Sequence, residues 1–173
     1  MFSQLKSFSQ HRLSWALLFV FVIFFELCAL FFQHIMNLAP CVMCIYERVA
    51  MFGIGAAALV GLISPQYWPI RFIGLLGWLA ASVKGYQLAT QHVDYQLNPS
   101  PFATCDIYVQ FPSWAPLNQW LPSVFEAYGD CSEIVWQWLT LSMPQWLVII
   151  YAANIAVSLL FIGCQVAKSN PHK

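Results

Sequence analysis

The stretch WALLFVFVIFFELCALFF, residues 15–32, decides the fold class of this 173-residue chain. It contains one charged side chain, Glu26, and at about 1.5 Å per helical residue it is long enough to cross the ~30 Å hydrocarbon layer of a bilayer. Across the whole chain 60% of residues are apolar or aromatic and only 8% are charged, which excludes a soluble domain with an ordinary polar surface. We therefore predict an all-α integral membrane protein.

Three more stretches meet the same length criterion: residues 45–63, 70–89 and 146–164. The short turn at 64–69 can only join antiparallel neighbours, so the economical architecture is a four-transmembrane-helix bundle forming a single integral membrane domain over residues 1–173. The first span follows Lys6 and Arg12 as a signal peptide would, but its length and the bulky residues after it favour an uncleaved anchor.

The cations predict the orientation, because Lys and Arg stay with cytoplasmic segments. Residues 85–167 contain no Lys or Arg but hold five acidic side chains, whereas the cations near the chain ends and the 64–69 turn fall on one side: Lys6, Arg12, Arg71, Lys168 and Lys173. Both termini are therefore expected in the cytoplasm, and the loops at 33–44 and 90–144 outside it. The zero formal net charge gives no reason to expect nucleic-acid binding.

The second outward loop is long enough to be functional, and its many aromatic residues argue against simple disorder. Apolar residues recur at helical spacing within 113–127, which predicts a short interfacial helix on the membrane surface. Pro116 and Pro122 interrupt a continuous helix, so an irregular aromatic loop packed on the helix ends is the alternative.

The cysteines divide by depth. Cys28 and Cys164 lie inside predicted spans, where a thiol usually packs as a small apolar group. The other four lie on the exported side, where disulfides persist: Cys41, Cys44, Cys105 and Cys131. Three pairings are possible; local spacing favours Cys41 with Cys44, and two purely structural disulfides remain an alternative. Turn-forming residues precede both members of the remaining pair, so we expect that pair on accessible backbone.

Redox chemistry is indicated by Cys41 and Cys44, a Cys-X-X-Cys at the start of a helix. Arg48 lies four residues after Cys44 on the same helix face, about one turn deeper, where a charge is expensive and marks a functional site. It can favour the reactive thiolate. The alternatives are that Arg48 pairs with Glu47 or extends its charged end to the membrane surface.

Two further intramembrane charges, Glu26 and Lys84, could pair with each other or with Arg48, or Glu26 could stay protonated. His34 and His92 flank the outward loops and raise zinc as a rival ligand. The cysteine spacing lacks the paired ribbon pattern, so we predict no metal.

Electrons accepted by a disulfide must be passed on, and the sequence contains no nucleotide-binding glycine pattern. A quinone dissolved in the bilayer fits as the acceptor. Such a molecule could enter a pocket beside Cys44, Arg48 and His92 by moving laterally.

Five motifs together carry a family resemblance: FQH (32–34), PCVMCIYER (40–48), PSPFATCD (99–106), GDC (129–131) and MPQW (143–146). On these motifs the chain resembles the DsbB family of disulfide-forming quinone reductases of the bacterial inner membrane, over essentially its whole length. The DsbA–DsbB–quinone route keeps the bacterial periplasm oxidising.

The resemblance implies an electron relay. A reduced DsbA-like thioredoxin-fold oxidant would attack the Cys105–Cys131 disulfide at Cys105, and Cys131 would then attack Cys41 and free Cys44 as a thiolate beside ubiquinone or menaquinone. Arg48 would stabilise that thiolate and the quinone, and His92 would line the pocket. The implied enzyme is a protein-dithiol:quinone oxidoreductase without metal or nucleotide cofactor. Two other classes stay open: a membrane protein whose disulfides only brace its loops, and a metal-handling membrane protein.

Overall fold

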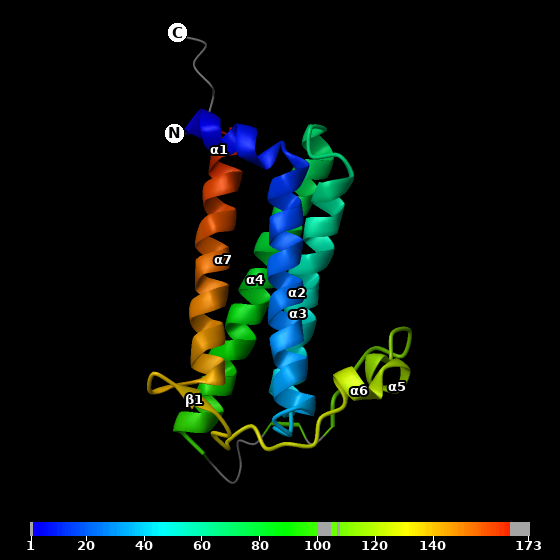
Figure 1. The fold of residues 1–173 in the computed structure, drawn as a ribbon, viewed down its shortest axis with the longest axis vertical. Coiled ribbons are helices and arrows are strands. Elements are labelled where there is room, and N and C mark those ends of the chain that lie inside the picture. Colours follow the sequence, from blue (N-terminus) through cyan, green and yellow to red (C-terminus); the bar gives the residue numbers. More distant parts are fainter. Residues whose placement is uncertain (1, 100–104, 107, 167–173) are drawn as a thin grey trace.

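A computed structural model describes residues 2–99, 105–106 and 108–166 of the chain. Lys168 and Lys173, used above for orientation, and residues 100–104 before Cys105 lie outside the described residues. Four long helices run side by side (Figure 1): α2 (Arg12–His34), α3 (Val42–Ile63), α4 (Trp68–Leu97) and α7 (Met143–Val166). A short helix, α1 (Phe2–Ser9), precedes them.

Three of these helices, α2, α3 and α7, are long and apolar enough to cross a membrane. Helix α4 is longer, but it carries Arg71 and Lys84 and is less apolar. The all-α membrane class is therefore confirmed, whereas a fourth span stays a prediction.

The start of α2 and the end of α7 lie at one end of the bundle, and the cysteine loops lie at the other (Figure 1). At the first end, Phe8 of α1 stacks on Phe161 and Gln165 donates a hydrogen bond to Ser9. The start of α2 and the end of α7 thus lie at the same end of the bundle, and the side of the membrane on which that end lies stays a prediction.

The observed helices extend beyond the predicted spans. Helix α3 begins three residues earlier than expected, because Cys41 caps it: the Cys41 sulfur accepts a hydrogen bond from the Cys44 backbone N–H at 3.3 Å. Helix α4 continues to Leu97, well past the predicted end at residue 89, and stops directly before Pro99. Its last turns carry polar residues, which a hydropathy criterion for membrane spans excludes.

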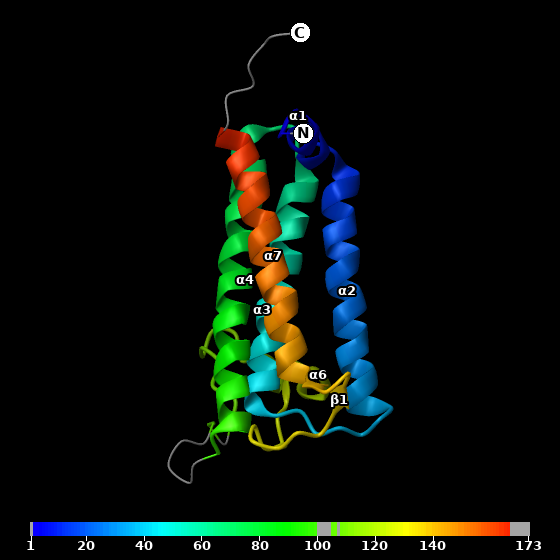
Figure 2. The ribbon, with the colours of Figure 1, turned by 90° about the vertical axis from the view of Figure 1, so that its left-hand side faces the viewer.

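Helix α3 packs between α2 and α4, and α4 packs between α3 and α7, while α2 and α7 make little direct contact (Figure 2). Small residues allow the close packing. A Cβ added at Gly61 would lie 2.2 Å from the Trp15 ring, and one at Gly85 would lie 2.3 Å from the Tyr151 ring. These rings fill the notches that glycine leaves on α3 and α4.

The long loop forms two helical turns, α5 (Leu117–Trp120) and α6 (Pro122–Phe125), separated at Leu121. Both predicted alternatives are thus partly right: helical turns form, and the prolines interrupt them. Whether they lie on a membrane surface stays a prediction. A two-stranded hairpin that the sequence did not indicate, β1 (Gln137–Trp138) with β2 (Leu141–Ser142), leads directly into α7.

Candidate functional site

The long loop docks on the short loop through backbone contacts. The Tyr128 and Gly129 backbone N–H groups both donate to the Pro40 carbonyl at 3.0 Å, and Gly129 forms a parallel bridge with Cys41. A Cβ at Gly129 would lie 2.4 Å from the Ala39 carbonyl oxygen, so only glycine permits this approach. Cys131, two residues later, is thereby brought to Cys41.

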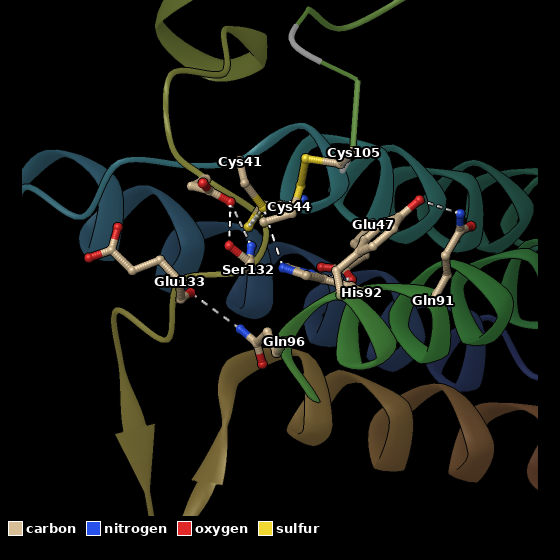
Figure 3. Close-up of a disulfide and its surroundings, with 12 residues drawn as sticks. Cys41, Cys44, Glu47, Gln91, His92, Gln96, Cys105, Ser132 and Glu133 are labelled. Carbon is tan, nitrogen blue, oxygen red and sulfur yellow. Dashed lines mark hydrogen bonds and ion pairs between the residues drawn. A yellow bond between two sulfur atoms is a disulfide. The ribbon is translucent and has the colours of Figure 1, made fainter. Parts of the chain in front are cut away.

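The four cysteines outside the predicted spans meet in one cluster. Cys41, Met43 and Cys131 form its buried part, and the side chains of Cys44 and Cys105 pack against them. Cys105 and Cys131 form a disulfide, while Cys41 and Cys44 are thiols with their sulfurs 2.7 Å apart (Figure 3). The disulfide pairing that the resemblance implied is therefore present.

One expectation about this disulfide was wrong. Cys105 is only partly buried, but Cys131 is 1% exposed and not on accessible backbone. The turn signal at Gly129-Asp130 was read as a free loop, whereas the backbone bonds to Pro40 bury the following residue. Access from solution is thus better at Cys105 than at Cys131.

Asp130 fixes the backbone on either side of Cys131. Its Oδ1 accepts hydrogen bonds from the Ser132 backbone N–H and hydroxyl, both at 2.8 Å. These bonds lower the pKa of Asp130 below its usual range. The carboxylate therefore stays ionised at neutral pH and holds the turn around Cys131.

Arg48 is buried beneath the cysteines and joins three segments. Its Nη1 donates to Gln33 Oε1 at 2.9 Å on α2 and to the Val124 carbonyl at the end of α6. Its Nε lies 3.6 Å from Glu26 Oε2. Of the alternatives left open by the sequence, pairing with Glu26 is therefore the one observed, and Lys84 is exposed on α4.

His92 lies beside Cys41 and pairs with Glu47. Its Nε2 is 3.5 Å from the Cys41 sulfur, and its Nδ1 is 2.9 Å from Glu47 Oε1 (Figure 3). Glu47 thus pairs with His92 and not with Arg48. His34, the other histidine at this end, contacts the Ser123 carbonyl at 2.9 Å.

A cavity of about 460 Å³ opens beside these groups, between α2 and α7. Its walls are mostly apolar and aromatic, and its polar lining includes Cys44, Glu26, Glu47, Arg48 and His92. Within the described part of the chain, Arg48 Nε and Glu26 Oε2 are buried atoms without a hydrogen-bond partner. A mostly apolar cavity with a few convergent polar groups is typical of a small-molecule site.

A comparison with known proteins shows the family to which the chain belongs. The family model described as "Disulfide bond formation protein DsbB" matches residues 11–161. The chain belongs to the DsbB family. It is 64% identical over 168 residues to disulfide bond formation protein B of Vibrio cholerae, covering 97% of each chain. The corresponding protein of Vibrio parahaemolyticus is 63% identical over 173 residues, covering 98% of this chain and 97% of the relative.

Membership of the DsbB family makes the chain an oxidoreductase of disulfide formation. The structure brings every site residue predicted from the sequence to one end of the bundle: Cys41, Cys44, Arg48, His92, Cys105 and Cys131. The roles assigned to them stay predictions.

The geometry also sharpens the zinc alternative. The sulfurs of Cys41 and Cys44 and a ring nitrogen of His92 lie within 4.8 Å of one another, which are the donor atoms of a possible metal site. Spacing in the sequence argued against zinc, because one Cys-X-X-Cys with two single cysteines lacks the paired ribbon pattern. The absence of a resident metal in this DsbB-family chain stays a prediction.

Sequence reasoning missed three contributors to the site. Glu47 was considered only as a partner of Arg48, and neither Gln33 nor Tyr151 was singled out. Tyr151 is fully buried and donates from its hydroxyl to the Glu47 carbonyl at 2.7 Å. For Glu47, its position in the second turn of an apolar helix was a usable signal, since a carboxylate there needs a partner.

Proposed function

We propose that the chain is a membrane protein-dithiol:quinone oxidoreductase, which reoxidises a DsbA-like thioredoxin-fold oxidant and reduces a membrane quinone. The observation that carries this proposal is the packing of both cysteine pairs in one cluster beside an apolar cavity. One pair can exchange with a protein thiol, and the other adjoins a space for an apolar electron acceptor.

The electron path follows the exposure of the sulfurs. A partner thiolate attacks Cys105, which is the less buried member of its disulfide, and Cys131 leaves as a thiolate. Cys131 then attacks Cys41 in the Cys41–Cys44 disulfide and releases Cys44 as a thiolate, while a second partner thiol displaces Cys105. The partner leaves as a disulfide. The Cys105 thiol then attacks Cys131 in the Cys131–Cys41 bond, which restores the Cys105–Cys131 disulfide and releases the Cys41 thiol. Two electrons therefore remain on Cys41 and Cys44.

The cavity fits a quinone ring as the acceptor of those electrons. Cys44 and Arg48 both line it, and the unpartnered Arg48 Nε is a donor for a ring carbonyl. Two electrons and two protons convert the quinone to a quinol and restore the Cys41–Cys44 disulfide. Ubiquinone and menaquinone both meet this description.

We further propose the location: the bacterial inner membrane, crossed four times, with both termini cytoplasmic. The loops at 33–44 and 90–144 then face the periplasm, where the DsbA-like partner is found. In this proposal the single domain over residues 1–173 is embedded in the lipid bilayer and binds no nucleic acid.

The decisive experiment mixes the purified protein with quinone and a reduced thioredoxin-fold dithiol and follows quinone absorbance. Steady loss of quinone supports the proposal. Stoichiometric zinc binding without turnover would instead favour a metal-handling protein, for which the Cys41, Cys44 and His92 donors are the specific observation. No turnover and no zinc would indicate purely structural disulfides.

The two cysteine pairs should be separable by mutation. We expect Cys105→Ser to abolish oxidation of the protein dithiol but to leave Cys41 and Cys44 able to reduce quinone, because the cavity adjoins only the second pair. Quinone absorbance after chemical reduction of the variant measures the second activity. Cys164→Ala, at the far end of α7, is the control. Loss of both activities in Cys105→Ser would contradict this division.

A further inference from the structure

A line of three buried side chains connects the cysteine pair to a carboxylate. The Cys41 sulfur faces His92 Nε2 at 3.5 Å, and His92 Nδ1 faces Glu47 Oε1 at 2.9 Å. Each of the three residues is at most 3% exposed. A cysteine, a histidine and an acid in this order form the arrangement by which a base is oriented toward a thiol.

The surrounding contacts leave the Glu47 carboxylate paired with His92. The nearest cation, Arg48, makes its ion pair with Glu26 and not with Glu47. The Tyr151 hydroxyl binds the Glu47 carbonyl, and the Tyr151 ring fills the notch at Gly85 on α4. This contact fixes α3 against the helix that carries His92. The side chains of Glu47 and His92 are therefore held next to each other by the packing of α3 and α4.

The proposed function leaves one proton of the relay without an acceptor. When Cys41 and Cys44 close to a disulfide, two electrons pass to the quinone and the Cys41 thiol loses its proton, whereas Cys44 already reacts as a thiolate. Cys44 adjoins the cavity, but Cys41 is 2% exposed and is not part of the cavity wall. Only its thiolate can attack, so a buried group must take its proton.

We propose that His92 accepts the Cys41 thiol proton as the Cys41–Cys44 disulfide forms, and that Glu47 is the positioning residue that orients His92. This inference rests on the proposed function. Nδ1–H donates to the Glu47 carboxylate, which leaves the Nε2 lone pair directed at the Cys41 sulfur. The Cys41 S–H bond breaks, its proton moves to Nε2, and the S–S bond to Cys44 forms as the electron pair reaches the quinone. The proton then leaves His92 for the quinol oxygen or for water.

Other titratable groups near His92 do not replace it. Cys44 is a reacting group itself, Tyr95 packs against the cysteine cluster from the same helix as His92, and the Cys131 segment contributes its backbone. From α7, Tyr151 donates to a carbonyl and its ring contacts α4. Among the described residues that carry a basic nitrogen, His92 is the one within 3.5 Å of the Cys41 sulfur.

The first test is a single-turnover measurement on the full chain in lipid nanodiscs. The protein is reduced to the dithiol form, mixed with saturating ubiquinone, and followed by quinone absorbance from about pH 6 to about pH 9. We expect Glu47→Gln to lower the rate at least about 10-fold at pH 6–7, and His92→Ala about 100-fold. Both defects should shrink toward about pH 9, because a higher pH favours the reactive thiolate without help from a base.

Matched variants separate positioning from folding. Glu47→Asp keeps the carboxylate and should recover part of the rate, whereas Glu133→Gln alters an exposed loop acid and should change nothing. A defect that is equal at every pH, or that appears only as a raised KM for quinone, would overturn the inference.

The second test does not need quinone reduction. Nitrogen-15 shifts of the His92 ring in the labelled dithiol protein at about pH 8 should show the Nδ1–H tautomer. The Nε2–H tautomer would exclude His92 as the base even in an active protein. A wild-type chain that fails to reduce quinone but shows the Nδ1–H ring would instead contradict the proposed function alone.

Discussion

At the scale of single residues, Arg48 is the side chain that joins three parts of the site. It is 7% exposed and holds Gln33 of α2, the Val124 carbonyl and the Glu26 carboxylate together. Breaking a buried ion pair by removing one partner typically costs about 3–5 kcal/mol, because the other charge stays buried and unpaired. A planar guanidinium can serve three directions at once, which an ammonium group on a flexible stem cannot.

We therefore expect Arg48→Ala to raise the quinone KM about 10- to 100-fold, as removal of a charged hydrogen bond of about 1.5–3 kcal/mol implies. Arg48→Lys keeps the charge and should raise KM much less. Steady-state quinone reduction measures both. Arg12→Ala, a variant of an exposed arginine at the far end of α2, is the control. Equal effects of the alanine and lysine variants would mean that the charge alone does not support quinone binding and that the directed hydrogen bonds of the guanidinium are required.

At the scale of elements, docking of the long loop depends on one glycine. The contact between Gly129 and residues 39–41 is made by backbone atoms, and the Cys131 segment follows it. Side-chain contacts add a second attachment, since Gln33 and His34 both reach the Ser123 carbonyl. Displacing the backbone contact alone should loosen Cys131 while the α5 and α6 turns stay attached.

We expect Gly129→Ala to undock the Cys131 segment, because overpacking against a rigid carbonyl costs about 1–3 kcal/mol. Labelling of Cys131 by a water-soluble maleimide in the reduced protein should become about 10-fold faster, in line with that energy. Gly163→Ala is the matched control, since a Cβ there meets nothing within 4 Å. Unchanged labelling in Gly129→Ala would show that the loop is held by its side chains.

The elements differ in how far the sequence could predict them. Long apolar runs predicted the four long helices, because burial in a bilayer depends on length and composition alone. The contact between Cys41 and Cys131 could not be predicted from spacing, since it depends on backbone bonds between distant residues, Pro40 and Gly129. The pairing of Glu47 with His92 likewise depends on how α3 and α4 pack.

At the scale of the whole molecule, the redox groups are all at one end and the described parts of both chain ends at the other. The cavity beside Cys44 lies between α2 and α7, which contact each other little. A molecule diffusing in the bilayer could thus reach Cys44 from the side, while a protein partner reaches Cys105 from the aqueous end.

This arrangement requires α4 to cross the bilayer, which can be tested by labelling. In intact cells an impermeant maleimide should label Ser113→Cys but reach Gln66→Cys, in the turn between α3 and α4, only after permeabilisation. The wild-type chain controls for native cysteines. If α4 did not cross, both positions would lie on the same side and label alike.

The cap of α3 links the redox state of Cys41 to the first turn of this helix. The atom that closes the first turn of α3 is the Cys41 sulfur, which accepts the Cys44 N–H. In the proposed relay that sulfur exchanges its S–H bond for an S–S bond, so the atom that caps α3 changes its bonding partner when electrons pass. Helix α3 also carries Glu47 and Arg48, which contact α4 and the long loop. In that proposal, a change of oxidation state at one sulfur would act on the helix that contacts the loop carrying Cys131.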